Sequence, residues 1–229
     1  MEIIPAILEK NFSEIEKKIK KLEPYFKKAQ IDFGDGLFVQ EKSGDLDGFK
    51  KISINIDLEA HIMIEKPWTV IDQLKELGFK KIIFHYESFL SVKKKTRGFA
   101  INNLIKGIKK EIQGTRGKQG INGNIEVGIA INPETDPSHI IDYLPRIDEV
   151  LLLSVNPGQK GQSFQSDVLT KINFLKNLKK DLIVGIDGGV NDKSIEAITK
   201  AGADQVYVNS FLWKEKSLKD AIKKLQIMI

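Results

Sequence analysis

Cysteine is absent from the 229 residues, and histidine and methionine occur only three times each. The absence of cysteine excludes disulfides and thiolate chemistry and is typical of a protein kept in a reducing interior. No segment approaches the roughly 18 consecutive apolar residues of a membrane span. The first residues, MEIIPAILEKNF, lack a basic segment followed by a long apolar core. We therefore expect a cytoplasmic protein with no membrane partner.

A large excess of one charge is also lacking. The 36 Lys and Arg residues face 31 Asp and Glu residues, and the lysines are spread along helix-like segments such as EIEKKIKKLEPYFKK. Such spreading is typical of a solvated surface, so we expect no nucleic-acid partner. With 41% hydrophobic and 29% charged residues, the composition is that of an ordinary globular protein.

Short apolar runs rich in Ile and Val recur along the chain, and most are followed by an amphipathic segment. Several runs are apolar throughout, as expected of parallel strands that are covered on both faces. They predict eight strands, over residues 2–8, 29–33, 58–64, 81–87, 126–132, 149–155, 181–187 and 205–211.

The amphipathic segments predict helices over 13–22, 69–78, 166–178 and 193–202, the last with N-caps at Asn191 or Asp192 and a C-cap at Gly202. Eight strand-then-helix units in 229 residues predict a (β/α)8 TIM barrel, in one domain over 1–229. An open doubly wound sheet is the alternative. The glycine-rich segment 113–124 is expected to be a loop without chemistry.

Polar residues gather where the predicted strands end. The carboxyl ends of the strands form the active site of a parallel barrel, and burying many polar groups without a task is costly. We expect a shared pocket lined by Asp32, Asp35, His61, His85, Glu87, Asn132, Ser154, Asn156, Asp187, Asn209 and Ser210.

Glycine-rich turns follow the last three strands, with the sequences NPGQKGQSF, DGGVND and NSF. Glycine lets backbone N–H groups close around an anion, and barrels often hold a phosphate after strands seven and eight. Three adjacent turns of this kind favour a phosphorylated substrate.

Asp32 and Asp187 end the second and seventh predicted strands, which we place on roughly opposite sides of the barrel. Two opposed acid/base groups can invert a stereocentre beside a carbonyl, because one removes the proton and the other returns a proton to the far face. The enediolate between these steps needs its charge offset, and Asp32, His61 and Asp187 suit a divalent ion. Alternatively, the aspartates cap turns, a reading that is strongest for Asp35.

Seven segments resemble the ribulose-phosphate 3-epimerase family over nearly the whole chain: PAIL, QIDFGDGLFV, HIMIEKP, HYE, VGIAINPETDP, LLLSVNPGQKGQSF and GIDGGVN. The resemblance implies a barrel that interconverts ribulose 5-phosphate and xylulose 5-phosphate in the pentose phosphate pathway, with Asp32 and Asp187 as catalytic residues. It also implies a divalent metal (zinc, iron(II) or manganese) and a homo-oligomer. Substrate and phosphate contacts are expected at Met63, Ser154, Gly158, Gly161, Gly188, Gly189, Asn209 and Ser210.

The metal site departs from the family pattern. Gln30 stands where the family has its first metal-binding histidine, while Asp32, His61 and Asp187 match. Because an amide oxygen is a poorer zinc ligand than imidazole, we expect Gln30 to be a weak fourth ligand and the metal to be weakly held or absent. Further departures surround the substrate: Ala6 replaces a serine, Gly34 and Leu153 replace methionines, Leu37 replaces a histidine, and Lys160 and Asn209 replace glycines.

His85 and Glu87 match a family H-x-E pair and are expected to support the metal site, whereas His139 is expected on the surface. We interpret the chain as an epimerase for a phosphorylated ketose. One alternative is an epimerase for another sugar phosphate, such as hexulose 6-phosphate. The other is an impaired homologue that only binds a sugar phosphate. The related decarboxylase barrels carry a D-x-K-x-x-D motif, which DFGDG lacks.

Overall fold

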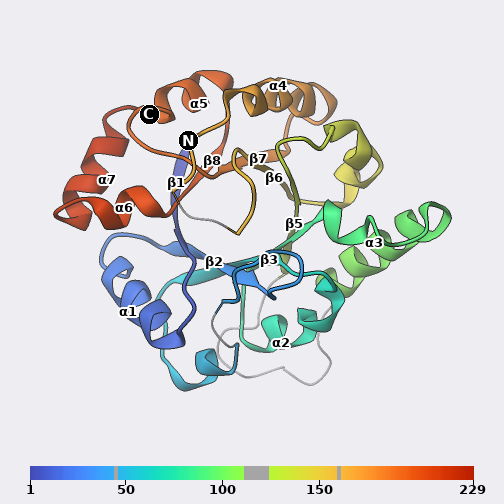
Figure 1. Cartoon of the computed structure of the whole chain (residues 1–229), viewed down its shortest axis with the longest axis horizontal. Coiled ribbons are helices and arrows are strands. Elements are labelled where there is room, and N and C mark those ends of the chain that lie inside the picture. Colours follow the sequence, from blue (N-terminus) through green and yellow to red (C-terminus); the bar gives the residue numbers. More distant parts are fainter. Residues whose placement is uncertain (44–45, 111–123, 159–160) are drawn as a thin grey trace.

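Eight parallel strands pair in chain order, and the last pairs with the first to close a ring (Figure 1). This computed structural model describes residues 1–43, 46–110, 124–158 and 161–229. Lys160 and residues 113–123 of the predicted loop lie outside the described residues. The closed ring confirms the predicted (β/α)8 barrel and excludes the open sheet. That residues 1–229 form one domain stays a prediction.

The barrel strands are Glu2–Ile7 (β1), Lys28–Gly34 (β2), Asp57–Met63 (β3), Lys81–His85 (β4), Glu126–Ile131 (β5), Glu149–Leu153 (β6), Ile183–Asp187 (β7) and Gln205–Val208 (β8). The α-helices outside them are Phe12–Leu22 (α1), Ile71–Glu76 (α2), Lys94–Lys109 (α3), Leu169–Leu178 (α4), Ile195–Ala201 (α5), Ser210–Lys214 (α6) and Leu218–Gln226 (α7). Short 3₁₀ helices span Leu46–Lys51 (η1), Pro67–Thr69 (η2), Tyr86–Phe89 (η3), Pro137–Arg146 (η4) and Ser166–Val168 (η5).

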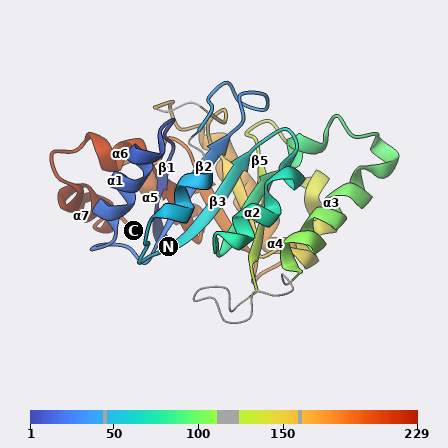
Figure 2. The ribbon, with the colours of Figure 1, turned by 90° about the horizontal axis from the view of Figure 1, so that it is seen from below.

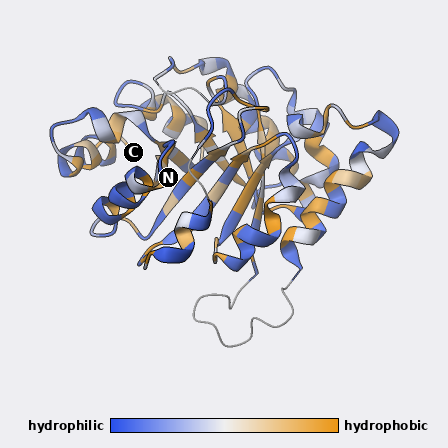
Figure 3. Cartoon of the chain, turned by 60° about the horizontal axis from the view of Figure 1, so that its bottom comes forward, coloured by the Kyte–Doolittle hydropathy of each residue, from blue (hydrophilic) through white to orange (hydrophobic). Residues whose placement is uncertain are grey.

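The helices cover the barrel because each has one apolar face. In α1, Ile15, Ile19 and Leu22 are spaced three or four residues apart and are fully buried, so they meet the strands on one side of the helix. Figure 2 shows the strands crossing the barrel at a tilt with the helices outside. Figure 3 shows the hydrophobic colour concentrated on the strands and the hydrophilic colour on the outer helix faces. None of the described helices has the length and apolar composition that crossing a bilayer requires.

All eight predicted strands are present, but several end earlier than predicted. β4 ends at His85, β6 at Leu153 and β8 at Val208, so Glu87 lies in η3, Ser154 in the loop after β6 and Ser210 at the start of α6. α5 begins later than predicted, although Asn191 caps the turn before it, where its side-chain oxygen accepts the Lys193 N–H. Ser194 precedes this helix, and the carbonyl of Asn191 accepts the N–H groups of Ser194 and Ile195 in the preceding turn. The predicted C-cap is confirmed, since Gly202 has a φ of 86°.

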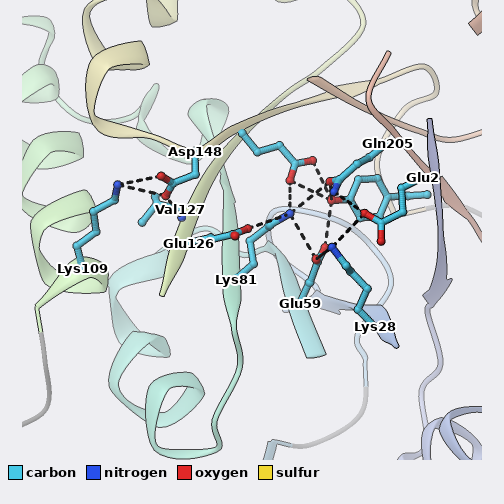
Figure 4. A network of polar contacts seen from close by, with 11 residues as sticks. Glu2, Lys28, Glu59, Lys81, Lys109, Glu126, Val127, Asp148 and Gln205 are labelled. Carbon is cyan, nitrogen blue, oxygen red and sulfur yellow. Dashed lines mark hydrogen bonds and ion pairs between the residues drawn. The ribbon is translucent and has the colours of Figure 1, made fainter. Parts of the chain in front are cut away.

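A buried network of polar side chains fills the amino-terminal end of the barrel (Figure 4). We call Glu59, Lys81, Glu149, Gln205 and Tyr207 the basal network. Lys81 Nζ lies 2.7 Å from Glu149 Oε2, 3.3 Å from Glu59 Oε1 and 3.3 Å from Gln205 Oε1. Each of the five side chains is at most 5% exposed. The charge of Glu149 and that of Glu59 outweigh burial and raise the pKa of Lys81, so this lysine is charged.

The basal network contains more acceptors than one phenol can serve. Tyr207 Oη lies 2.8 Å from Glu149 Oε1, 3.1 Å from Glu59 Oε2 and 3.1 Å from Gln205 Oε1, yet it carries a single proton. Burial raises the pKa of Glu59 despite the nearby charge of Lys81. Of the two buried glutamates, Glu59 is therefore the one that more readily takes up the missing proton, while Glu149 pairs with Lys81.

Above the basal network lies an apolar layer that separates it from the opposite end of the barrel. Its buried members are Ile4, Ala6, Ile83, Ala130, Leu151 and Leu153, packed with the ring of Tyr207. Gly185 is required beside this ring, because a Cβ atom there would lie 2.8 Å from Tyr207 Cε2 and 2.4 Å from Glu149 Oε1. The barrel interior is therefore polar at both ends and apolar between them.

The protonation of Glu59 predicts an asymmetry between the two glutamates. Glu59→Gln keeps a donor toward Tyr207 and should change the free energy of unfolding by no more than about 1 kcal/mol. Glu149→Gln removes the nearest carboxylate of Lys81 and leaves the more exposed Glu126, at 3.4 Å, as its ionised partner, so it should cost about 3 kcal/mol. Urea denaturation of both variants measures the difference. Equal losses would show that Glu59 is ionised.

Candidate active site

A cavity of about 200 Å³ opens among the carboxyl ends of the strands. Eleven residues predicted for the site line it: Asp32, His61, Met63, Asn156, Gly158, Gly161, Asp187, Gly188, Gly189, Asn209 and Ser210. Gln30 and Ser154 do not line it, because both side chains are fully buried. The strand ends thus bring most of the predicted residues together.

Asp32 and Asp187 reach one cavity from strands on roughly opposite sides of the barrel, as predicted. β8 and β1 lie between β7 and β2 in the ring of eight, so the two strands are three steps apart, one short of the maximum. Gln30 Nε2 donates to both carboxylates, over 2.8 Å to Asp32 Oδ1 and 2.9 Å to Asp187 Oδ2. His61 Nδ1 lies 3.0 Å from Asp32 Oδ1 and 3.6 Å from Asp187 Oδ2.

Burial and the charge of Asp32 raise the pKa of Asp187 to about 7. Two carboxylates that share one donor repel each other when both are ionised, which favours a proton on one of them. Asp187 can therefore exchange a proton near neutral pH, as an acid/base group must.

A chain of buried side chains extends from Asp32 to Glu87. His61 Nε2 lies 2.9 Å from His85 Nε2, and His85 Nδ1 lies 3.1 Å from Glu87 Oε2. The other oxygen of Glu87 accepts hydrogen bonds from the Asn132 N–H and the Thr135 hydroxyl. The H-x-E pair thus holds His61 in place, which is the supporting arrangement expected from the sequence.

The three contacts Asp32–His61, His61–His85 and His85–Glu87 need three protons, whereas two neutral imidazoles carry two. Burial lowers the pKa of His85. Burial also opposes charge on His61, but the hydrogen bond and charge of Asp32 outweigh it and raise the pKa of His61. Of the two imidazoles, His61 is therefore the one that more readily takes up the third proton.

Asp32, His61 and Asp187 also have the chemistry of a metal site. One ligand atom from each lies within 4.8 Å of the others, and carboxylate oxygens with imidazole suit a divalent ion. These three residues fit the metal that the family resemblance implies. Gln30 does not fit as the fourth ligand in this arrangement, because it presents N–H groups and not a lone pair to the other residues.

Glycines form the other end of the cavity. Gly158, Gly161, Gly188 and Gly189 all have positive φ. At Gly188 a Cβ atom would lie 2.4 Å from Val155 Cγ2, so no larger residue fits this turn. In the part of the chain that the structure describes, the N–H groups of Gly189 and Ser210 donate to no other residue. They remain available to an anion in the cavity.

Two predicted residues have other roles in the structure. The Ser154 hydroxyl donates to the carbonyls of Asp187 and Gly188, so it fixes the end of β7 and does not face the cavity. Asp35 accepts the N–H groups of Leu37, Phe38 and Glu65, which is the turn-capping role considered for it. His139 is exposed, as predicted, and stacks on Tyr86.

Gly34 is explained by the loop that follows β2. A Cβ atom at Gly34 would lie 2.3 Å from the Glu41 carbonyl oxygen, so this loop backbone fills space that a side chain would need. The Gly34 carbonyl accepts the Ser43 N–H, and the Gly34 N–H donates to the Ser43 hydroxyl. Leu37, at the tip of this loop, is 75% exposed.

Sequence reasoning missed Lys214, which lines the cavity near the glycine turns. Its Nζ would lie 3.8 Å from a Cβ atom at Gly161. Lys214 follows Ser210 by four residues, a spacing that places both on one side of a helix. That spacing was the available signal. It was missed because the strand was predicted to continue to residue 211.

The sequence of the chain matches a known protein family. The chain fits the model of the Ribulose-phosphate 3 epimerase family over residues 2–213. It belongs to the ribulose-phosphate 3-epimerase family. Membership of this family supports an epimerase function with a sugar phosphate as the substrate.

Individual members of the ribulose-phosphate 3-epimerase family align over most of the chain. The chain is 32% identical to the ribulose-phosphate 3-epimerase of Chlamydia muridarum over 197 residues, which cover 82% of this chain and 77% of that protein. It is 29% identical to that of Bacillus subtilis over 236 residues, which cover 99% and 98%.

Solved structures that resemble the chain include 3-hexulose-6-phosphate synthase from Salmonella typhimurium, with a TM-score of 0.66 and 15% identity over 100% of this chain and 98% of that one. KGPDC from Streptococcus mutans in complex with D-R5P gives a TM-score of 0.65 and 10% identity, over 99% and 95%. At these identities the likeness concerns the fold alone.

The raised pKa of Asp187 predicts a pH-dependent stability of the metal-free protein. Its stabilising contribution is fully present below the ordinary pKa of about 4 and is lost as pH rises through about 7. In EDTA, Asp187→Asn should therefore lose less of its free energy of unfolding between pH 5 and pH 8 than the unaltered chain does. Urea denaturation across this range measures it.

The exposed Asp181, just before β7, offers a matched control. Asp181→Asn should retain the pH dependence of the unaltered chain. An unchanged pH dependence in Asp187→Asn would contradict the raised pKa.

Proposed function

We propose that this protein epimerises a phosphorylated ketose at C3, and that its substrate is ribulose 5-phosphate, converted to xylulose 5-phosphate. The observation that carries this proposal is the pair Asp32 and Asp187, both facing one cavity that ends in glycine turns with unused N–H groups. A sugar with a phosphate at one end and a carbonyl near the other matches these two ends.

Asp32 and Asp187 are proposed as the acid/base residues. One carboxylate removes the C3 proton, and the electron pair of that C–H bond moves into the C2 carbonyl to form an enediolate. The other, protonated, delivers its proton to the opposite face of C3 as the carbonyl re-forms. The stereochemistry of the substrate decides which aspartate acts first. A pKa of about 7 suits Asp187 to either direction.

His61 lies beside the reacting carboxylates, with its Nδ1 3.0 Å from Asp32 Oδ1, and the raised pKa of His61 favours a positive charge there. Asp32, His61 and Asp187 would hold a divalent ion (zinc, iron(II) or manganese), which when bound supplies further positive charge to offset the enediolate. Met63 and Leu153 line the apolar wall and exclude water. Gly158, Gly161, Gly188, Gly189, Asn209 and Ser210 are proposed to bind the phosphate end.

Two alternatives follow from the departures from the family pattern. Gln30 changes the surroundings of the metal-binding residues, and Ala6 and Gly34, which do not line the cavity, replace larger family side chains behind it. These changes are consistent with another sugar phosphate, such as hexulose 6-phosphate, or with a protein that binds a sugar phosphate without turnover. A cytoplasmic homo-oligomer also remains a prediction from the sequence.

Solvent exchange at C3 tests the proposal. With D-ribulose 5-phosphate in D2O, the C3 proton signal should disappear as xylulose 5-phosphate forms, with EDTA or with added zinc, iron(II) or manganese. Asp32→Asn and Asp187→Asn should each reduce the exchange rate by at least about a hundredfold. Asp181→Asn, outside the cavity, serves as the control. If the folded protein binds the sugar phosphate but shows no exchange under any metal condition, the epimerase proposal fails and the protein only binds a sugar phosphate.

Lys214 should contribute to phosphate affinity. Lys214→Met is expected to raise KM about tenfold and leave kcat within about twofold, because the phosphate is remote from C3 and contributes binding in the ground state and transition state alike. Steady-state kinetics with the exposed neighbour Lys216→Met as control measure this. A fall in kcat at unchanged KM would contradict this role.

A further inference from the structure

Gln30 lies at the junction of the two aspartates and has no route to solvent. It is fully buried on β2, next to Ala6 in the pairing of β1 with β2. Its Nε2 makes two hydrogen bonds, to Asp32 Oδ1 at 2.8 Å and to Asp187 Oδ2 at 2.9 Å. One amide group thus joins carboxylates that come from different strands of the barrel.

The orientation of this amide follows from the chemistry of its neighbours. The NH2 end faces Asp32 Oδ1 and Asp187 Oδ2, because an ionised carboxylate accepts hydrogen bonds and the reverse orientation would place the amide oxygen against it. Gln30 Oε1 is buried and has no hydrogen-bond partner among the described residues. An unsatisfied buried oxygen is costly, and in this orientation the two hydrogen bonds of Nε2 are what offset that cost.

The Gln30 amide and a metal ion would interact with the same two carboxylates, the amide as a hydrogen-bond donor and the ion as the group that they ligate. Gln30 Nε2, together with His61 Nδ1, offers hydrogens to the oxygens that a divalent ion would need. An ion bound by Asp32, His61 and Asp187 would face these hydrogens at short range.

We propose that Gln30 is a positioning residue that holds Asp32 and Asp187 together by hydrogen bonds, and that it opposes metal binding at this site. The paired carboxylates are then organised in the metal-free protein, and an ion binds only by displacing the amide. Here the glutamine is a competitor of the metal and not its weak fourth ligand.

Two substitutions at Gln30 distinguish a competitor from a ligand. Gln30→Met removes both the NH2 group and the oxygen at similar length, and Gln30→His introduces an imidazole ligand. Binding of Co2+ to EDTA-treated and dialysed protein is measured by calorimetry and by the visible absorption of the bound ion, with no substrate present.

If Gln30 opposes the metal, Gln30→Met should bind Co2+ more tightly than the unaltered chain, and Gln30→His should lower the Kd at least about tenfold. Without metal, Gln30→Met should melt at a lower temperature, since the carboxylates lose their shared donor, and Co2+ should restore much of the loss. Added Co2+ should raise the melting temperature of the unaltered chain less than that of Gln30→Met or Gln30→His.

The opposite result for Gln30→Met overturns the proposal. Weaker Co2+ binding than in the unaltered chain would show that the Gln30 oxygen is a ligand. If Gln30→His does not fold, Gln30→Met alone decides between the two. Gln73→Met and Gln73→His, on α2 and hydrogen-bonded to Asp47, control for the new side chains and should leave Co2+ binding unchanged.

The inference concerns the same cavity as the proposed function but does not rest on turnover. Metal binding and melting are read without substrate, so a failure of C3 exchange would leave this test intact. Likewise, an active epimerase that binds Co2+ through the Gln30 oxygen would overturn only the present proposal.

Discussion

The pairing of β8 with β1 is the constraint on which the site depends. It consists of four residue pairs, from Glu2 with Gln205 to Pro5 with Val208, and it converts a row of strands into a ring. In an open row β2 and β7 would lie far apart. In the ring only β8 and β1 separate them, and one glutamine side chain spans from Asp32 to Asp187. Backbone hydrogen bonds at the seam therefore determine the distance between the two carboxylates.

Closure also leaves an interior that side chains must fill completely. The lower end is filled by the basal network, the middle by the apolar layer around Tyr207, and the upper end by the carboxylates and histidines. Buried charge is tolerated at the lower end because Lys81 pairs with Glu149. At the upper end the aspartates are balanced by His61 and by the Gln30 amide. The two polar regions thus both compensate buried charge, the lower one with an ion pair and the upper one with imidazole and amide groups.

Much of this arrangement could be predicted from the sequence. Apolar runs gave the eight strands, and aspartate, histidine and glycine at their ends gave most of the cavity, because strand period and turn chemistry are local properties. The distance between the Asp187 and Asp32 carboxylates could not be obtained this way, since it depends on ring closure. Ser154 was misjudged because a polar residue after a strand can face the cavity or bond the neighbouring backbone, and sequence does not distinguish these. For Gln30, sequence showed a lost ligand but not which end of the amide faces the aspartates.

Tyr207 belongs to both halves of the barrel. Its ring lines the cavity, and its hydroxyl lies among Glu59, Glu149 and Gln205 below. The depth available to a ligand is thus set by a residue that the charged lower end also requires. A chain of this kind cannot deepen its cavity for a longer sugar by shortening this residue alone, because water would then reach the Lys81 ion pair. The length of substrate that the cavity accepts and the stability of the barrel therefore both depend on Tyr207.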